Sequence, residues 1–196
     1  MQTVEVVGVL LAAGSGSRMG EPKALVTDAL GVPWLTRSVD ALYEGGCARV
    51  IVVLGAAAAE AIALIEDHSP ATRTIVAHDW QTGMSASLRC GLVAAADDPA
   101  DVALVHLVDL PTVGPAVVAR LVAAAQASPV PSAYLARAVH GPRPGHPVAI
   151  GRDHGRNLSA TLTGDSGGKM YLDAHDVSLI ECSDLSDGHD VDSIVT

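Results

Sequence analysis

A glycine-rich loop follows an apolar run near the start of the chain, and it constrains the fold more than any other feature. The run at residues 4–13 is short, apolar and rich in β-branched residues, which predicts a buried strand. Three glycines and two cations share the loop that follows it: Gly14, Gly16, Gly20, Arg18 and Lys23. Glycines adopt backbone angles that other residues resist and let amide groups approach a ligand closely. This combination indicates a site for a phosphate-rich ligand.

Two common phosphate-binding motifs do not fit this loop. A P-loop requires Gly-Lys followed by Ser or Thr, whereas Lys23 stands between Pro22 and Ala24. A dinucleotide fingerprint requires G-x-G-x-x-G, whereas the glycines here are spaced one residue further, and the second expected strand ends in Leu54-Gly55 without an acid for a ribose. An ordinary strand-to-helix turn explains the glycines alone. The two cations favour a ligand site.

Strand and helix patterns alternate along the chain and predict a three-layer α/β/α fold. The first four strands are expected at residues 4–13, 49–54, 73–78 and 102–108, and helices at 34–44, 56–67, 85–96 and 115–127. Because these strands are continuous apolar runs, they predict a mostly parallel sheet that is covered by helices on both faces. Ligands bind beyond the carboxyl ends of such strands, where the glycine loop, the segment after His78 and Asp109 would meet.

The last third of the chain has shorter elements, which make the expected sheet mixed. Strands are expected at 132–139 and 146–151 around a Pro/Gly-rich loop, as a hairpin or an antiparallel edge, with a last strand at 177–182. Short helical pieces are expected at 158–162 and 169–173. At 196 residues without a convincing linker, the chain is interpreted as a single domain over residues 1–196.

Charge and composition exclude several classes of protein. The formal net charge of −10 argues against nucleic acid as a partner, because phosphate backbones bind basic surfaces. The three distant cysteines, Cys47, Cys90 and Cys182, form no metal-binding pattern and are expected to be reduced thiols. No basic region precedes the first apolar run, so a signal peptide is not expected, and no apolar stretch reaches the roughly 20 residues that span a bilayer. We therefore expect a cytoplasmic protein with no membrane partner.

The glycine loop also carries a resemblance to a known family. The segment Leu11-Ala-Ala-Gly-x-Gly-x-Arg-Met-Gly-x-x-Lys23 resembles the signature loop of the MobA-like nucleotidyltransferases, and most of all the MocA-like molybdenum cofactor cytidylyltransferases. The resemblance implies a Rossmann-like nucleotidyltransferase fold of the GT-A-like kind. It implies that Arg18 and Lys23 hold the phosphates of a nucleoside triphosphate and act in catalysis. The implied nucleotide-binding residues of the loop are Leu11, Ala12, Ala13, Gly14, Gly16, Arg18 and Lys23.

Asp109 follows the apolar run at 104–108 and precedes Leu110-Pro111. An acid at the carboxyl end of a strand can face a ligand crevice, but it can equally cap the turn that Pro111 forces. The segment resembles the family's Asp-x-Pro element, whose Asp binds Mg²⁺. The resemblance therefore implies that Asp109 is a catalytic residue and a magnesium ligand.

A second carboxylate is expected from the tail, because magnesium in such sites takes one or two carboxylates plus phosphates and water. The segment Asp190-Val-Asp192-Ser resembles the family's closing Asp-x-Asp-Thr motif and implies Asp192 as the second metal ligand, with Asp190 as its substitute. A solvated acidic tail is the alternative, since four aspartates crowd into residues 184–192. The family continues with Pro-Glu-Asp and this chain with Ile-Val-Thr, which leaves the anchoring of the tail open.

A third element, Gly83-Met-Ser-Ala-Ser-Leu, opens the helix expected at 85–96. Ser85 is expected to cap this helix, whose first turn would offer free amide groups. A plain capped helix would explain the pattern. The segment also resembles the family's Gly-Met-Ser-x-Ser-Leu element, which lies beside the nucleotide. The resemblance implies that Gly83, Ser85 and Ser87 contact the base or the ribose.

Two further elements resemble parts of the family's acceptor site. Gly145-His-Pro-Val resembles a Gly-x-Pro element and implies that His146 touches the acceptor, although a structural histidine in a turn is the alternative. The segment from Leu162 to Lys169 resembles a loop that usually ends in Arg, and Lys169 keeps the charge but loses the bidentate fork. The other histidines show no zinc pattern, and His106 is interpreted as a hydrogen-bonded core residue.

The resemblance implies transfer of CMP from CTP to the phosphate of molybdenum-loaded molybdopterin, with Mg²⁺ as cofactor and pyrophosphate as the leaving group. Ala13 resembles the cytidylyl branch of the family, where the guanylyl branch has Gly. Molybdenum hydroxylase apoenzymes or their chaperones are the implied protein partners. Transfer from GTP, another phosphorylated acceptor, and a catalytically silent nucleotide-binding or cofactor-chaperone module stay open as alternatives. The acceptor and the oligomeric state are not determined by the sequence.

Overall fold

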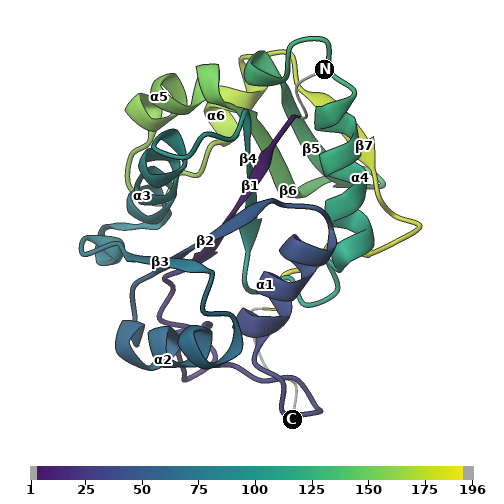
Figure 1. Cartoon of the computed structure of the whole chain (residues 1–196). Coiled ribbons are helices and arrows are strands. Elements are labelled where there is room, and N and C mark those ends of the chain that lie inside the picture. Colours follow the sequence, from purple (N-terminus) through teal and green to yellow (C-terminus); the bar gives the residue numbers. More distant parts are fainter. Residues whose placement is uncertain (1–3, 192–196) are drawn as a thin grey trace.

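The computed structural model describes residues 4–191 and contains a seven-stranded mixed sheet. The strand order is β3-β2-β1-β4-β6-β5-β7, and β1, β2, β3 and β4 are parallel to one another (Figure 1). β6 runs antiparallel to both of its neighbours, and β7 pairs parallel to β5. The strands are β1 (Val6–Ala12), β2 (Arg49–Leu54), β3 (Arg73–Val76), β4 (Val102–Leu107), β5 (Leu135–His140), β6 (Arg143–Gly151) and β7 (Ser178–Glu181). The predicted three-layer, mostly parallel α/β/α fold is confirmed.

Helices cover both faces of this sheet, as the continuous apolar strands predict. The apolar residues of α1, α2 and α4 pack with one face of β1, β2 and β4, and those of α3, α5 and α6 pack with the other face. Figure 1 shows these two groups on opposite sides of the central strands β1 and β4. The helices are α1 (Trp34–Glu44), α2 (Ala58–His68), α3 (Met84–Ala96), α4 (Pro115–Gln126), α5 (Arg152–Thr161) and α6 (Lys169–Asp173).

The order of the strands creates a crevice at the edge where the parallel strands end. β1 pairs with β2 on one side and with β4 on the other, so the connections leave β1 and β4 in opposite directions. The carboxyl ends of the strands at such a reversal are where ligands bind in open α/β sheets. Leu11 lies opposite Leu107 in this register, so the glycine loop and Asp109 both begin at this point.

The expectations about the cysteines and about His106 have different outcomes. All three cysteines are free, as expected. His106 lies in the core as expected, fully buried on β4, but the predicted hydrogen bond is wrong: neither ring nitrogen has a partner among the described residues. Within residues 4–191, no helix has the length and apolar character that crossing a membrane requires.

Candidate active site

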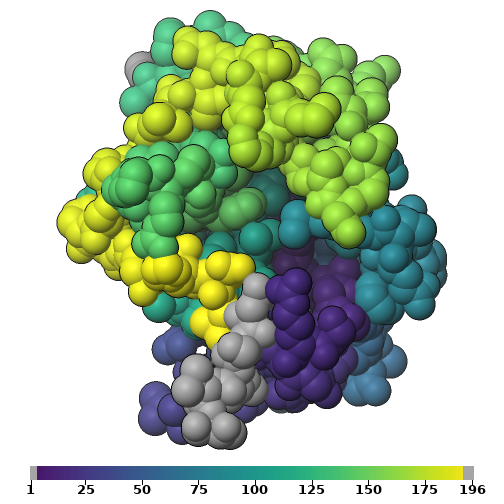
Figure 2. Space-filling model, turned by 180° about the vertical axis from the view of Figure 1, so that it is seen from behind, coloured from purple at the N-terminus to yellow at the C-terminus, as the bar shows by residue number. Residues whose placement is uncertain are grey.

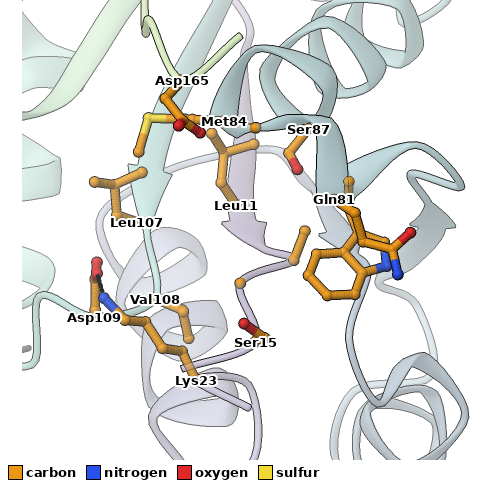
Figure 3. Close-up of a pocket in the computed structure, with 14 residues that line it drawn as sticks. Leu11, Ser15, Lys23, Gln81, Met84, Ser87, Leu107, Val108, Asp109 and Asp165 are labelled. Carbon is orange, nitrogen blue, oxygen red and sulfur yellow. Dashed lines mark hydrogen bonds and ion pairs between the residues drawn. The ribbon is translucent and has the colours of Figure 1, made fainter. Parts of the chain in front are cut away.

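A cleft of about 300 Å³ opens at the carboxyl ends of β1 and β4. Figure 2, which views the molecule from behind, shows a hollow among the purple loop after β1, the lime segment that carries α5 and α6, and the yellow tail. Figure 3 shows that side chains from several segments point into the cleft. Its lining residues are Leu11, Ala13, Gly14, Ser15, Lys23, Trp80, Gln81, Gly83, Met84, Ser87, Leu107, Val108, Asp109 and Asp165.

The glycine loop is a series of tight turns and not the start of a helix. The carbonyl oxygen of Gly16 accepts hydrogen bonds from the amides of Met19 at 2.7 Å and Gly20 at 2.9 Å. Gly16 has φ +58°, and a Cβ there would lie 1.9 Å from the carbonyl oxygen of Glu21. Only glycine fits this position. The turn folds the chain back so that Lys23 points into the cleft (Figure 3).

Lys23 and Asp109 form an ion pair inside the cleft. The Nζ atom of Lys23 lies 2.5 Å from Oδ2 of Asp109, and the two side chains are only 19% and 14% exposed. They are 86 residues apart in sequence and meet because β1 and β4 are neighbours in the sheet. The structure therefore brings together two of the three residues that the sequence singled out for catalysis.

Arg18, the third of these residues, lies on the outer side of the same loop. It lines a neighbouring hollow of about 240 Å³ that shares Gly14, Ser15 and Lys23 with the cleft. Gly16 also lines this hollow and not the cleft. The buried Ala12 lies in β1 and lines neither. The loop thus presents its two cations to adjoining spaces, an arrangement that suits a long polyanion.

The start of α3 differs from the prediction in one respect. Ser85 does not cap this helix, because Gly83 is the N-cap residue and Ser85 is buried within the first turn. The amide of Ser85 donates to the carbonyl oxygen of Gly164 at 3.1 Å, so it is not free for a ligand. Gly83 has φ +122°, and a Cβ there would lie 2.6 Å from Oδ1 of Asp165. Gly83 and Ser87 line the cleft, and Ser85 does not.

Asp165 is a cleft residue that the sequence reasoning missed. Its side chain lies beside Met84, at the end of the cleft opposite Lys23 (Figure 3). The sequence does contain a signal, because an acid stands between glycines in the same loop as Lys169. Trp80 and Gln81 were missed as well; they line the cleft from the short turn before α3.

A second cavity of about 140 Å³ contains both residues predicted for the acceptor site, His146 and Lys169. Burial lowers the pKa of His146 to about 4, so its ring is neutral at pH 7. The exposed Lys169 pairs with Asp173 on α6. The cavity adjoins the cleft, because three segments of the chain line both. Leu88, Val105 and Gly167 line the cavity, and their near neighbours in sequence, Ser87, Leu107 and Asp165, line the cleft.

The tail returns to the carboxyl edge of the sheet. The amide of Val191 donates to the carbonyl oxygen of Asp109 at 2.9 Å. This bond places Asp190 next to the strand end that carries Asp109. Asp192, the predicted second metal ligand, lies outside the described residues.

The donor atoms of the cleft fit a divalent metal ion that is held partly by substrate. Within residues 4–191, no three acidic, histidine or cysteine side chains form a metal-binding cluster. Asp109 supplies a carboxylate at the cleft wall, and phosphate oxygens and water would supply the other ligands of the ion. One carboxylate with substrate phosphates is a common arrangement for Mg²⁺.

Comparison with known proteins decides the family to which this fold and cleft belong. Residues 8–179 match the family described as MobA-like NTP transferase domain. The chain belongs to this family. The family recognised from the glycine loop is therefore confirmed, and with it the broad class of nucleotidyltransferases.

Three solved structures of two proteins resemble the chain over most of its length. Rv0371c from Mycobacterium tuberculosis H37Rv is 27% identical with a TM-score of 0.78, over 97% of this chain and 94% of that one. A second structure of Rv0371c is a complex with manganese, with 25% identity and a TM-score of 0.73 over 91% and 88% of the two chains. A nucleotidyl transferase from Methanothermobacter thermautotroptrophicus is 25% identical with a TM-score of 0.73, over 90% and 87%. A divalent metal therefore accompanies this fold in a relative.

One curated relative has a name from another reaction class. Nicotine blue oxidoreductase from Paenarthrobacter nicotinovorans is 36% identical over 195 residues, which cover 96% of this chain and 93% of that protein. The name describes a redox reaction of that protein.

Proposed function

We propose that the protein transfers CMP from CTP to the phosphate of molybdenum-loaded molybdopterin, releasing pyrophosphate and forming molybdopterin cytosine dinucleotide. The observation that carries this proposal is the ion pair of Lys23 and Asp109 beside the glycine loop, at the edge where nucleotides bind in such sheets. Ala13, which lines the cleft, supports CTP over GTP by its resemblance to the cytidylyl branch. Asp192 and Asp190 remain the proposed source of a second metal ligand.

The reaction needs positioning and charge stabilisation more than a covalent nucleophile. An oxygen of the acceptor phosphate attacks the α-phosphorus, and the bond from that phosphorus to the bridging oxygen of pyrophosphate breaks. Lys23 and Arg18 stabilise the charge that grows on the leaving pyrophosphate. Mg²⁺, held by Asp109 and the phosphates, would neutralise charge on the reacting oxygens. Gly83 and Ser87 orient the base and ribose at the start of α3.

Release of pyrophosphate tests the proposal directly. The purified protein is assayed with magnesium and each of four nucleoside triphosphates, with and without molybdenum-loaded molybdopterin. We expect release with CTP that depends on the acceptor. Release with GTP would move the assignment to the guanylyl branch, and release only with another phosphorylated acceptor would replace molybdopterin. Binding of CTP without turnover on any acceptor would favour a silent module.

Variants of the ion pair test the assigned roles. Lys23→Ala and Asp109→Ala are each expected to lower the rate by about a hundred- to a thousand-fold while the fold persists, because each removes a charge that acts in the transition state. Asp67→Ala, at an exposed position near the end of α2, is the matched control and should leave the rate unchanged. A folded variant of either pair member with a near-wild-type rate would contradict its role.

The second candidate is an oxidoreductase activity, which the similarity to nicotine blue oxidoreductase favours. A redox reaction would need a redox cofactor such as a nicotinamide nucleotide, whose phosphates Lys23 and the glycine loop would hold and which would supply a hydride without a carboxylate-bound metal. Oxidation of NADH or NADPH in the presence of a quinone-type dye tests this candidate. If that activity exists and survives in Asp109→Ala, the redox assignment replaces nucleotidyl transfer.

A further inference from the structure

The cavity beside the nucleotide cleft contains a cation that the sequence analysis did not identify. Arg137 lies on β5, on the face that α3, α5 and α6 cover. Strand alternation places its side chain on the same side as Leu135, whose neighbours are apolar. The wall around Arg137 is formed by Leu88, Val105, Val148, Ile150, Leu158 and Leu172.

The guanidinium of Arg137 lacks the partners that a buried charge requires. Its Nε atom is buried without a hydrogen-bond partner among the described residues, and Nη2 makes one long bond of 3.4 Å to the carbonyl oxygen of Gly145. No carboxylate of the described chain lies within 4 Å of it, and Asp173 acts on it only at longer range. Burial lowers the pKa of Arg137, because a poorly solvated site disfavours the charged form. A half-buried, unpaired guanidinium is costly unless a ligand completes it.

The other ionisable side chains of the cavity do not supply a cation that could hold an anionic ligand there. His146 is neutral at pH 7, and the charge of Lys169 at the exposed rim is balanced by Asp173. Arg137 is therefore the cation of this cavity that lacks an acidic neighbour. A guanidinium presents two parallel N–H donors, a geometry that matches an oxyanion.

We propose that Arg137 binds an anionic group of the acceptor, separate from the phosphate that attacks CTP, and so selects which acceptor the enzyme uses. The proposal rests on the proposed function, since it places the acceptor in the cavity that adjoins the nucleotide cleft. The apolar wall accommodates the body of the acceptor, and Arg137 fixes the end remote from the reacting phosphate. The substrate class is therefore a phosphorylated compound with an apolar or planar body and a second negative charge.

A binding experiment tests the subsite without turnover. The probe is benzoate, which joins a planar apolar ring to a carboxylate, and the neutral benzamide is its matched control. The readout is the Nε–Hε resonance of Arg137 in ¹⁵N NMR spectra, assigned by its loss in Arg137→Lys. We expect millimolar benzoate to shift this resonance in a saturable way, while benzamide at the same concentration does not. Equal responses to the two compounds, or no response to either, would overturn the proposal.

The variants extend the same test to the natural acceptor. If the enzyme turns over, Arg137→Met should raise the KM for the acceptor by about 10- to 100-fold, the loss of a charge-assisted hydrogen bond, with an unchanged KM for CTP. Arg137→Lys should recover part of this loss, and Arg156→Met, at an exposed position of α5, should have no effect. An unchanged acceptor KM in Arg137→Met would contradict the proposal.

Failure of the two proposals can be told apart. The Nε–Hε resonance reports on the cavity whether or not CTP binds or reacts. A benzoate response without any CTP turnover would retain the anion subsite and reject nucleotidyl transfer. Turnover of CTP with an acceptor KM that does not depend on Arg137 would retain nucleotidyl transfer and reject the anion subsite.

Discussion

Replacing the buried His106 by leucine should remove part of the protein's loss of stability in mild acid. His106 lies on β4, in register with Leu10 of β1, and is fully buried without a hydrogen bond. Burial lowers its pKa to about 3. In the unfolded chain, an ordinary histidine has a pKa of about 6.5. Between these values the unfolded chain binds a proton that the folded protein does not, so its stability is retained above about pH 6.5 and lost as the pH falls.

The size of the effect follows from these two pKa values. Below about pH 6.5, each pH unit lowers the free energy of unfolding by about 1.4 kcal/mol, so His106 accounts for about 2 kcal/mol by pH 5. At pH 7.5, His106→Leu should be at least as stable as the wild type, because it removes unpaired polar atoms from the core. The advantage of the variant should then grow by about 2 kcal/mol between about pH 7.5 and 5.

Urea unfolding at several pH values measures this difference. His146, whose pKa burial lowers to about 4, adds a loss in the same direction that both proteins share. Glu181, whose pKa its hydrogen bonds with Ser183 lower to about 2, titrates below this window. His78→Gln, at an exposed position, controls for the loss of one histidine. Parallel pH profiles of the wild type and His106→Leu would refute the reasoning.

Two further predictions concern the glycine loop and the ion pair of Arg49 with Asp98 at the amino-terminal end of β2. Gly16→Ala should lower the melting temperature and weaken CTP binding at least tenfold, because its Cβ would collide with the carbonyl oxygen of Glu21. Gly20→Ala, also at positive φ but with open space around it, should lower the free energy of unfolding by only about 1–2 kcal/mol. Equal effects of the two variants in calorimetry would contradict the crowding at Glu21. Arg49→Met should lower the free energy of unfolding by about 1 kcal/mol, less at high salt, because its pair with Asp98 is partly exposed; a salt-independent loss would point to packing instead.

The hydrophobic pattern of the sequence was sufficient for much of the fold. The ranges of α1, β2 and α6 agree with the prediction, because each has a clear apolar period or run and a definite end. α5 was predicted only at 158–162, although it begins at Arg152. Its first half is polar and contains Gly155, and only Leu158 is buried in it, so no apolar period marks this helix. The bonds from Arg152 to the carbonyl oxygen of Ala100 tie its start to the sheet.

Only part of the candidate site could be predicted from the sequence. The glycines and Lys23 of the loop predicted a phosphate ligand, because backbone angles and charge depend on local residue types. Asp165 stands between glycines in a loop that the sequence marks as unusual, but local residue types do not place it in the cleft, nor do they place Arg137 in the second cavity. Only the packing of the 162–169 loop on Gly83 brings Asp165 into the cleft.

Strand order decided what the sequence alone could not. Arg137 reaches the second cavity because β5 pairs with β6 and β6 pairs with β4, and the same order places Lys23 against Asp109 across 86 residues. Propensity and apolar periodicity act between near neighbours in the chain and therefore can be read along it. Contacts between distant segments depend on which strands lie side by side, and only the folded sheet determines that.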